Sequence, residues 1–303
     1  MLVGTLAAAL GQALVLAASA AKGQAAPATP AAKAAPAPSP AAVAGPPAPP
    51  TGPQAPWKAL EPGLEVVELD GPPSDAAEGR ITVVRVDPAR FDLRLLAASA
   101  PGEGQIRTAR AWAYRAGASV AINAAMYQED YRTSVSLMRS ADHVNQRRLS
   151  KDKAVLAFDP LVSGVPAVRI VDRDCERLED AAARYATLVQ SIRMISCDRK
   201  NVWAPSERRY SAAAIGVDRA GRVLFIHSRA PWPIHDLVEA LLAAPLDLVQ
   251  AMYVEGGPEA QLFARGGGKE LERFGTFENA DTNTRAWPVP NVIAAIPKKP
   301  PGK

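Results

Sequence analysis

The most informative stretch of this sequence is AMYVEGGPE, residues 251–259. Its first four residues are mainly apolar and fit a buried strand, which delivers the carboxylate of Glu255 to the strand's end. Gly256 and Gly257 follow, and because glycine has no side chain, the main-chain N–H groups there are able to face an anion or a sugar oxygen. We therefore predict that Glu255, Gly256 and Gly257 belong to a ligand-binding site. The alternative is a tight turn with no ligand.

A second stretch, AINAAMY at residues 121–127, is also an apolar strand that ends at a polar side chain. The amide of Asn123 both donates and accepts hydrogen bonds, and the two alanines after it let a ligand approach the main chain closely. We predict that this strand end places Asn123 and Tyr127 at a ligand-binding site.

Around these two stretches the sequence is rich in predicted strands and contains few helices. Apolar spacing predicts helices at 108–116 and 234–244, and alternating patterns with β-branched residues predict the strands. We predict an α+β fold, a single domain built on a large mixed, mainly antiparallel β-sheet system with a few packed helices. The expected strands are 64–69, 80–86, 91–97, 119–123, 133–139, 154–158, 167–171, 187–195, 211–217, 222–227, 249–254 and 292–296.

The first 57 residues differ in composition from the rest of the chain. Residues 2–21 form an uncharged, mostly apolar run that ends in the small-x-small pattern Ala18-Ser19-Ala20, which signal peptidases cleave. Of the 35 residues from 22 to 56, 24 are Ala or Pro, which is typical of an extended spacer. The predicted segments are a signal peptide or membrane anchor at 1–21, an Ala/Pro-rich linker at 22–57 and a folded domain at 58–303. We therefore expect export to a periplasmic or extracellular location, with a membrane tether if the first segment stays uncleaved.

Composition and missing motifs exclude several kinds of function. The net charge is only +4 over 303 residues, with no long Lys/Arg block, so we expect no nucleic-acid partner. No cluster of histidines or carboxylates has the spacing of metal ligands, and the glycine-rich nucleotide motifs are absent from the sequence. We expect neither a metal nor a cofactor.

Cys175 and Cys197 are the only cysteines in the sequence. In the oxidising compartment that export implies, we predict a disulfide between them, which closes a loop of 23 residues. Loop closure of this kind contributes about 2–4 kcal/mol in the entropic account. The alternative is two free or buried thiols.

The segment HSRAPWPIH, from His227 to His235, connects a predicted strand to a predicted helix. Loops in this position often carry binding groups. We predict substrate contacts from His227, Ser228 and Arg229, and stacking of Trp232 on the face of a sugar. The alternative is a rigid connector with a packed tryptophan.

Four segments, in the right order along the chain, resemble motifs of one known family. They are similar to the N-A-G-M-Y, A-I-G, D-G-G-x-S and V-P-N motifs of the phosphodiester glycosidase family. The resemblance covers roughly residues 64–296 and implies one domain, because a division would separate the motifs. It also implies hydrolysis of the bond between a sugar and a phosphodiester, with a glycan or sugar phosphate as substrate. The segments are NAAMY at 123–127, AAIGVD at 213–218, EGGPE at 255–259 and WPVPN at 287–291.

The chain departs from the family pattern and resembles a divergent, bacterial-type branch. Glu255 stands where the family has aspartate, Glu259 replaces a serine, and Ala212 occupies the position of a common arginine. If that arginine contacts phosphate in relatives, another one must replace it here. Arg193 and Arg229 are the candidates, because a planar guanidinium group fits phosphate oxygens.

The implied reaction needs a carboxylate near the anomeric carbon, because the transition state resembles an oxocarbenium ion. Glu255 is the first choice for the catalytic group, as nucleophile, base or electrostatic stabiliser, and Asn123 would assist catalysis by orienting a sugar hydroxyl. Glu259, Asp130 and Asp236 are weaker partners. The leading hypothesis is an exported phosphodiester glycosidase that cleaves a sugar-1-phosphodiester bond in an envelope or extracellular glycan. Two alternatives stay open: a non-catalytic polysaccharide-binding envelope protein with the same fold, and a structural envelope protein without a ligand.

Overall fold

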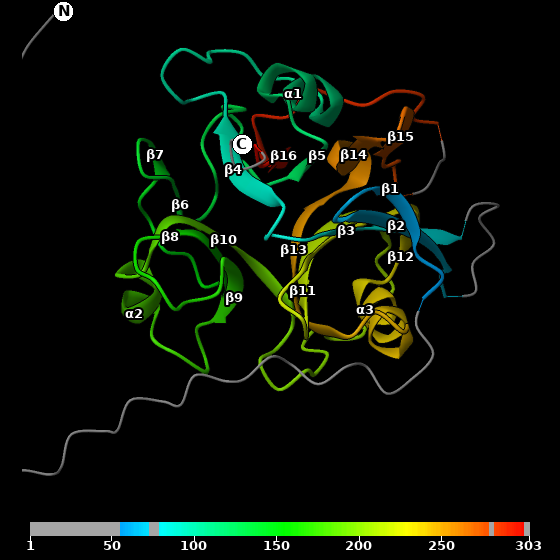
Figure 1. Cartoon of the computed structure of the whole chain (residues 1–303). Helices are drawn as coiled ribbons and strands as arrows, with labels where there is room; N and C mark the ends of the chain where they lie inside the picture. The colour runs from blue at the N-terminus through cyan, green and yellow to red at the C-terminus, as the bar shows by residue number, and fades with distance from the viewer. Residues whose placement is uncertain (1–54, 73–78, 279–281, 300–303) are drawn as a thin grey trace, which may run out of the picture. The chain divides into compact units, whose positions relative to one another are not determined.

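A computed structural model of the chain describes residues 55–72, 79–278 and 282–299 (Figure 1). The predicted signal peptide or anchor at 1–21, and residues 22–54 of the predicted linker, lie outside the described residues. Within the described part of the chain, no helix has the length and apolar character needed to cross a membrane.

The larger of two sheets contains eleven strands, and their pairings are antiparallel. The strands are β1 (Lys58–Glu61), β2 (Leu64–Asp70), β3 (Arg80–Val86), β6 (Met138–Arg139), β7 (Val144–Gln146), β8 (Ala154–Pro160), β9 (Val168–Asp172), β10 (Tyr185–Ile195), β11 (Tyr210–Asp218), β12 (Val223–Trp232) and β13 (Leu248–Gly256). Their order is β1-β2-β3-β12-β11-β13-β10-β6-β7, and β8 pairs with both β10 and β9.

The smaller sheet has five antiparallel strands in the order β15-β14-β5-β16-β4. They are β4 (Phe91–Ala97), β5 (Val120–Asn123), β14 (Gln261–Gly266), β15 (Lys269–Phe274) and β16 (Asn291–Pro297). A single 3-10 turn, Gly257–Glu259, leads from the end of β13 in the larger sheet into β14 in the smaller one. The AMYVEGGPE stretch is therefore a junction between the two sheets, and Asn123 ends the neighbouring strand β5.

The two sheets pack face to face, with a helix on each outer face (Figure 1). Val84, Ile215 and Leu262 are examples of buried side chains in the core between the sheets. Helix α3 (Ile234–Ala243) covers the outer face of the larger sheet, and α1 (Ala109–Ala116) covers the smaller one. A short helix, α2 (Leu178–Ala182), packs on β8 and β10.

Local sequence signals explain the ends of helix α1. The hydroxyl of Thr108 accepts a hydrogen bond from the N–H of Ala111 at 3.2 Å, which caps the first turn. Gly117 ends the helix with φ +66°, a left-handed conformation that favours glycine. The predicted helix at 108–116 is thus observed as residues 109–116.

The predicted α+β class and its mainly antiparallel sheets are confirmed. The expected strand at 133–139 is wrong for most of its length, because only Met138–Arg139 is a strand. Ser134 forms only an isolated bridge with Tyr127, and its N–H bonds to the Asn145 side chain at 2.7 Å, so the segment does not continue a sheet. The sequence patterns also did not predict four short or polar strands and one short helix, which are β1, β7, β14, β15 and α2.

Candidate functional site

The EGGPE turn follows a bulge in the larger sheet. Ala213 of β11 pairs with Glu255 of β13. The next residue, Ala214, pairs with Tyr253, so Val254 is an extra residue on β13. A bulge of this kind bends a strand and re-aims its side chains. Here it lies directly before the turn and determines where Glu255 leaves the sheet.

Both positions of the turn require glycine, Gly256 because of a close neighbour and Gly257 because of its backbone conformation. A side chain at Gly256 would overlap with the hydroxyl of Tyr253. Gly257 has φ +63°, in the left-handed region where other residues are strained. A side chain at Gly275 would overlap with the carbonyl oxygen of Gly257, so a second segment packs tightly on the turn. The position of the turn is therefore fixed from two sides.

The Asn123 side chain holds the far end of the same turn. Its Nδ2 donates to the carbonyl oxygen of Glu259 at 3.0 Å, and its Oδ1 accepts from the N–H of Gln261 at 2.7 Å. Asn123 is buried. Its amide thus brackets Ala260 and joins β5 to the start of β14. These contacts give Asn123 a positioning role for the turn.

The carboxyl group of Glu255 occupies a poorly solvated position. Burial raises its pKa from 4.5 to about 8, against the opposing hydrogen bond from the Gly256 N–H to Oε1 at 3.0 Å, and Glu259 adds a smaller upward effect. Burial also raises the pKa of Glu259. At pH 7 Glu255 is therefore mainly protonated, the state in which a carboxyl group donates a proton or a hydrogen bond.

Two partly or fully buried tyrosines border this pair of carboxyl groups. Burial, and then the negative charge of Glu255, raise the pKa of both Tyr127 and Tyr253. Each tyrosine packs on a second aromatic ring: Tyr127 on Tyr131, and Tyr253 on Trp203. The ring centroids are 5.5 Å apart in both pairs. The carboxyl pair therefore has two aromatic pairs in its neighbourhood.

Carboxyl groups and tyrosines are the ionisable neighbours that act on the pKa values of Glu255, Tyr127 and Tyr253. The arginines Arg229 and Arg273 instead act on His227, which bonds to the Ala260 carbonyl after the turn. A phosphate anion close to Glu255 would find neutral hydrogen-bond donors in main-chain N–H groups and in the protonated Glu255 itself.

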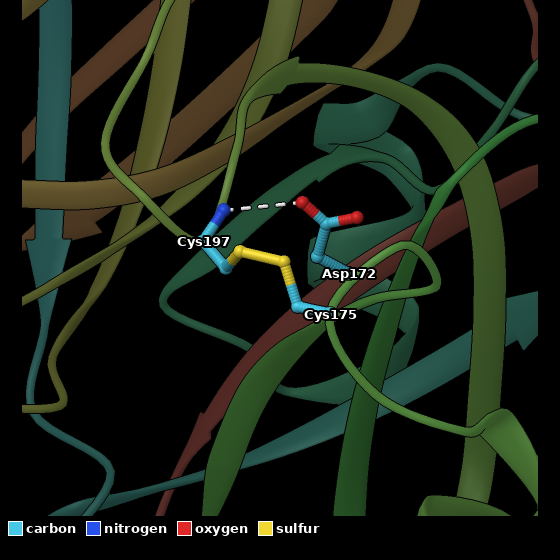
Figure 2. A group of neighbouring side chains, drawn as sticks. All are labelled: Asp172, Cys175 and Cys197. Atoms are coloured by element: carbon cyan, nitrogen blue, oxygen red, sulfur yellow. Dashed lines mark hydrogen bonds between the residues drawn. A yellow bond between two sulfur atoms is a disulfide. The ribbon is translucent and has the colours of Figure 1, made fainter.

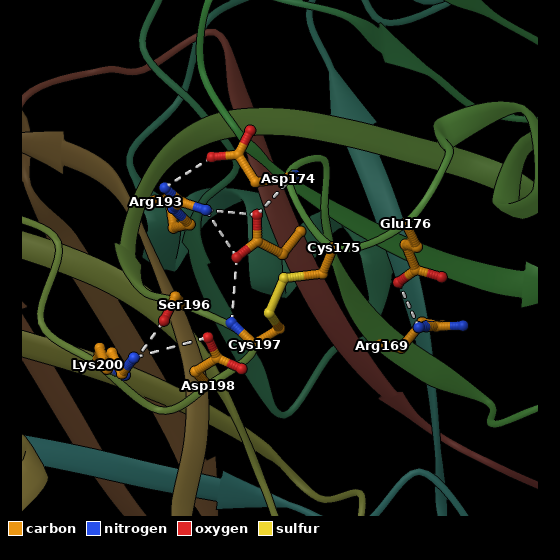
Figure 3. Close-up of a disulfide and its surroundings, with 10 residues drawn as sticks. Arg169, Asp174, Cys175, Glu176, Arg193, Ser196, Cys197, Asp198 and Lys200 are labelled. Carbon is orange, nitrogen blue, oxygen red and sulfur yellow. Dashed lines mark hydrogen bonds and ion pairs between the residues drawn. A yellow bond between two sulfur atoms is a disulfide. The ribbon is translucent and has the colours of Figure 1, made fainter.

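Arg193, a predicted phosphate contact, is bound to carboxylates instead (Figure 3). It pairs with Met252 of β13, and Met252 lies three residues before Glu255 in the sequence. Its guanidinium group nevertheless donates to Asp172 at 2.6 and 2.8 Å and to Asp174 at 3.0 Å, and the side chain is only 17% exposed. A phosphate would have to compete with both carboxylates for this arginine.

Arg229, the other candidate, holds the main chain of the segment after β15. Its Nη1 donates to the carbonyl of Phe274 at 2.9 Å, and its Nη2 donates to the carbonyl of Asn283 at 2.8 Å. The guanidinium carbon lies 4.9 Å from the centroid of the Phe274 ring. These contacts position the segment whose Gly275 packs on the glycine turn.

The other predicted contacts in the HSRAPWPIH segment are buried. His227 donates from Nε2 to the carbonyl of Ala260 at 3.2 Å, and burial lowers its pKa to about 3, so the ring is neutral. The Ser228 hydroxyl donates to the Ala230 carbonyl at 3.0 Å. Trp232 is only 1% exposed. The segment therefore matches a rigid connector, in which His227 holds the residue after the turn, Ala260, by a hydrogen bond.

Several residues near the turn were not singled out by the sequence patterns: Tyr131, Trp203, Tyr253, Gln261 and Gly275. Tyr131 and Trp203 lie in irregular segments, where no periodic pattern marks a ring as functional. The glycine in FGTF at 274–277 is the one usable signal, because an isolated glycine beside a strand often marks a close backbone approach.

The predicted disulfide between Cys175 and Cys197 is confirmed (Figure 2). It joins the segment after β9 to the segment after β10, with 6.6 Å between the Cα atoms. Buried Asp172 accepts from the N–H of Cys197 at 3.1 Å. Among the described residues, Asp172 and the two cysteines are the one group with the spacing of metal ligands, but both sulfur atoms are in the disulfide and offer no thiolate.

Two surface cavities are lined by residues outside the EGGPE turn. The larger, of about 400 Å³, lies beside the disulfide and includes Arg173, Cys175 and Glu179. The other, of about 300 Å³, lies between α1 and the smaller sheet and includes Trp112 and Ile296. We place the candidate active site at the turn, because the carboxyl pair and the fixed glycines are there.

Solved structures share this fold. The catalytic domain of zebrafish N-acetylglucosamine-1-phosphodiester alpha-N-acetylglucosaminidase, auto-inhibited by its pro-peptide, is similar with a TM-score of 0.59 and 12% sequence identity, over 81% of this chain and 87% of that chain. A hypothetical protein from Synechocystis is similar with a TM-score of 0.54 and 14% identity, over 82% of this chain and 64% of that chain. At these identities the likeness concerns the fold alone. No curated protein sequence matches the chain.

Sequence similarity identifies the family. The model of the phosphodiester glycosidase family matches residues 116–296, a range that includes the NAAMY and EGGPE segments. The chain belongs to the phosphodiester glycosidase family, and the resemblance of its motifs is confirmed.

Proposed function

We propose that this protein is an exported hydrolase that cleaves a sugar-1-phosphodiester bond in an envelope or extracellular glycan. Membership of the phosphodiester glycosidase family supports this reaction type. The zebrafish protein with a similar fold is named for action on an N-acetylglucosamine-1-phosphodiester. The observation that carries the proposal is the pair of carboxyl groups, Glu255 and Glu259, on one turn that neighbouring residues hold in place.

The two carboxyl groups divide the reaction between them. The bond from the anomeric carbon to the phosphate oxygen breaks, and its electron pair stays on that oxygen, which takes the proton of Glu255. Water bonds to the anomeric carbon and loses a proton to Glu259, whose negative charge also stabilises the oxocarbenium-like transition state. The products are a free sugar and a phosphate monoester, and proton exchange with solvent restores both side chains.

The protonated state of Glu255 also allows an anionic substrate to bind. Two ionised carboxylates would repel a phosphodiester, whereas a neutral Glu255 donates a hydrogen bond to a phosphate oxygen. The raised pKa of Glu255 supports this arrangement. In this chain the protonated carboxyl group takes the place of the arginine that is common in the family and is Ala212 here.

Export is supported by the apolar, uncharged residues 2–21, by the Ala/Pro-rich linker and by the disulfide, which persists in oxidising compartments. Fractionation of producing cells tests this part of the proposal. We expect the protein in the periplasmic, envelope or secreted fraction, and recovery of most of it in the cytoplasm would contradict export.

A second candidate function is non-catalytic binding of an envelope polysaccharide. The observation that favours it is the engagement of Arg193 with Asp172 and Asp174 and of Arg229 with main-chain carbonyls, which leaves both predicted phosphate contacts in structural roles. This function predicts glycan binding without release of product.

Hydrolysis assays separate the two functions. The substrates are a panel of sugar-1-phosphodiesters, including the methyl diester of N-acetylglucosamine 1-phosphate. We expect wild-type protein to release free sugar and Glu255→Gln to lose at least about a hundredfold in kcat/KM, within the range of acid–base catalysis. Glu179→Gln is the matched control, because Glu179 is an exposed carboxylate whose ion pair within the described residues is with Arg177. Equal rates for wild type and Glu255→Gln, or binding of glycans without turnover of any diester, would count against the hydrolase.

A further inference from the structure

Two aromatic pairs lie beside the carboxyl groups of the turn, and both have the same layout. In each pair an inner tyrosine lies near the turn, and an outer ring packs on it with centroids 5.5 Å apart. Tyr127 is the inner ring of one pair, and Tyr131 is its outer ring. Tyr253, whose hydroxyl fills the space next to Gly256, is the inner ring of the other, and Trp203 is its outer ring.

The two pairs pack against different cores of the domain. Tyr127 packs with the core between α1 and the smaller sheet. Trp203 and Tyr253 pack with the core between α3 and the larger sheet. The hydroxyl of Tyr253 lies next to Gly256, and Glu255 acts on the pKa of both inner tyrosines, so each pair has one ring close to the EGGPE turn.

The loop that carries Tyr131 is fixed in place by Asp130. The Asp130 Oδ1 accepts from the N–H of Arg132 at 2.9 Å and from the N–H of Thr133 at 2.8 Å. Tyr131 itself has φ +53°, an uncommon conformation for a residue with a side chain. Tyr131 is 53% exposed although its side chain is large and aromatic. Strained and pre-organised residues that present an exposed ring often occur at ligand sites.

The segment that carries Trp203 is anchored in a similar way. The main-chain N–H of Trp203 donates to Oδ1 of Asn201 at 3.0 Å, and Nδ2 of Asn201 donates to the carbonyl of His235 at 3.1 Å. The N–H of Val202 donates to the carbonyl of Met194 at 3.2 Å. Trp203 is partly exposed. These hydrogen bonds hold its segment in place, so the segment is already ordered before a ligand binds.

We propose that Tyr131 and Trp203, the outer rings of the two aromatic pairs beside Glu255 and Glu259, are sugar-stacking residues, and that each ring packs on the apolar face of one sugar unit. The inference rests on the proposed function for the nature of the ligand. A flat, rigid ring offers a large contact area at little cost in side-chain freedom. Two such rings hold more than one sugar unit, so binding should strengthen when an oligosaccharide becomes long enough to contact both.

The test is binding of neutral oligosaccharides, which the proposed activity does not cleave because they contain no phosphodiester. The probes are oligomers of one to four units of glucose, mannose or N-acetylglucosamine, measured by calorimetry with the full chain. For at least one series we expect wild-type affinity to rise about tenfold or more between one unit and longer oligomers. Tyr131→Ala and Trp203→Ala should each remove that rise, and Tyr131→Phe and Trp203→Tyr, which keep a ring, should retain most of it.

Tyr114→Ala is the matched control, because Tyr114 is also an exposed tyrosine but lies on α1 and contacts Glu270. It should leave the length dependence unchanged. Absence of binding in every series, or equal length dependence in wild type and both alanine variants, overturns the inference. The proposed function fails separately, if wild-type protein cleaves no sugar-1-phosphodiester. Thermal unfolding of each variant identifies any loss of folding, and in that case the ring-keeping variants supply the comparison.

Discussion

The hydroxyl of Tyr253 lies in the space that a side chain at Gly256 would occupy. Gly256 has an extended conformation, φ −141° and ψ 176°, which any residue adopts, so this contact is what excludes a side chain. The hydroxyl of Tyr253, which borders the carboxyl pair, is therefore the reason that the second position of the EGGPE turn is glycine.

This relationship predicts a coupled pair of variants. Gly256→Ala should lower the free energy of unfolding by about 1–3 kcal/mol, the usual range for overpacking. In a Tyr253→Phe background the same change should cost less, because the oxygen that it overlaps is absent. Only part of the cost should disappear, since the Cζ atom of Tyr253 would still lie 3.0 Å from the new Cβ. Chemical denaturation of the four proteins measures the coupling, and strictly additive effects would contradict the contact.

Asn123 should act through the turn it holds. Asn123→Ala removes both partners of buried main-chain groups at Glu259 and Gln261, which should cost about 1–3 kcal/mol per unsatisfied group. It should also lower kcat by misplacing Glu259. Asn123→Asp is the matched variant, because it keeps the acceptor for the Gln261 N–H and loses the donor to the Glu259 carbonyl. If Asn123→Ala unfolds at the same denaturant concentration as wild type, the positioning role is wrong.

The turn itself was predictable from the sequence, and its surroundings were not. An apolar run that ends in Glu255 and two glycines is a local signal, so the strand β13 and the position of the Glu255 carboxyl group at its end follow from periodicity and glycine chemistry. The pairing of that turn with Asn123 and Gly275 joins segments far apart in the chain. Such contacts depend on the order of the strands in the sheets, and the spacing of apolar residues along the sequence does not predict that order.

Arg193 and Trp232 show a second limit of sequence reasoning. Arginine and tryptophan are typical ligand contacts, yet their residue type does not reveal their neighbours. Arg193 meets Asp172 because β10 and the end of β9 lie together, and Trp232 is buried at the end of β12. The strand β15 has the polar sequence KELERF and was not predicted. It lies at the edge of its sheet, where alternating apolar residues are not required.

The raised pKa of Glu255 makes stability depend on pH. Because this carboxyl group holds its proton up to about pH 8 in the folded protein and only to about 4.5 when unfolded, the unfolded chain binds fewer protons between these values. Its contribution to the free energy of unfolding is therefore complete below pH 4.5 and is lost as the pH rises through 8. Each pKa unit corresponds to about 1.4 kcal/mol.

Glu255→Gln should remove this part of the pH dependence. We expect the variant to match wild type near pH 4.5 and to be more stable by a few kcal/mol near pH 8, on the scale of about 1.4 kcal/mol per pKa unit. Denaturant titrations at pH 4.5, 6 and 8 provide the measurement, with Glu179→Gln as the exposed control. A variant less stable than wild type at pH 8 would show that the ionised form of Glu255 has a favourable partner.

The pH dependence of activity distinguishes a general acid from a nucleophile at the same residue. If Glu255 donates its proton to the leaving phosphate, kcat/KM should fall as the pH rises through about 8, where the carboxyl group ionises. If it acts as nucleophile or base, kcat/KM should rise over the same interval. Glu255→Asp introduces the aspartate of the family at this position and is the matched variant. It should keep measurable activity with the same direction of pH dependence.

Reduction of the disulfide should destabilise the β9–β10 region. Cys175 and Cys197 hold together the segments that carry Asp172 and Arg193, and the covalent link limits the freedom of the unfolded chain. Replacement of both cysteines by serine should lower the free energy of unfolding by about 2–4 kcal/mol. Thiol titration of unfolded protein should find no reactive thiol before reduction and two after it. Two reactive thiols without reductant would falsify the disulfide, and equal stability of the double variant would show that the Asp172–Arg193 pair holds these segments without it.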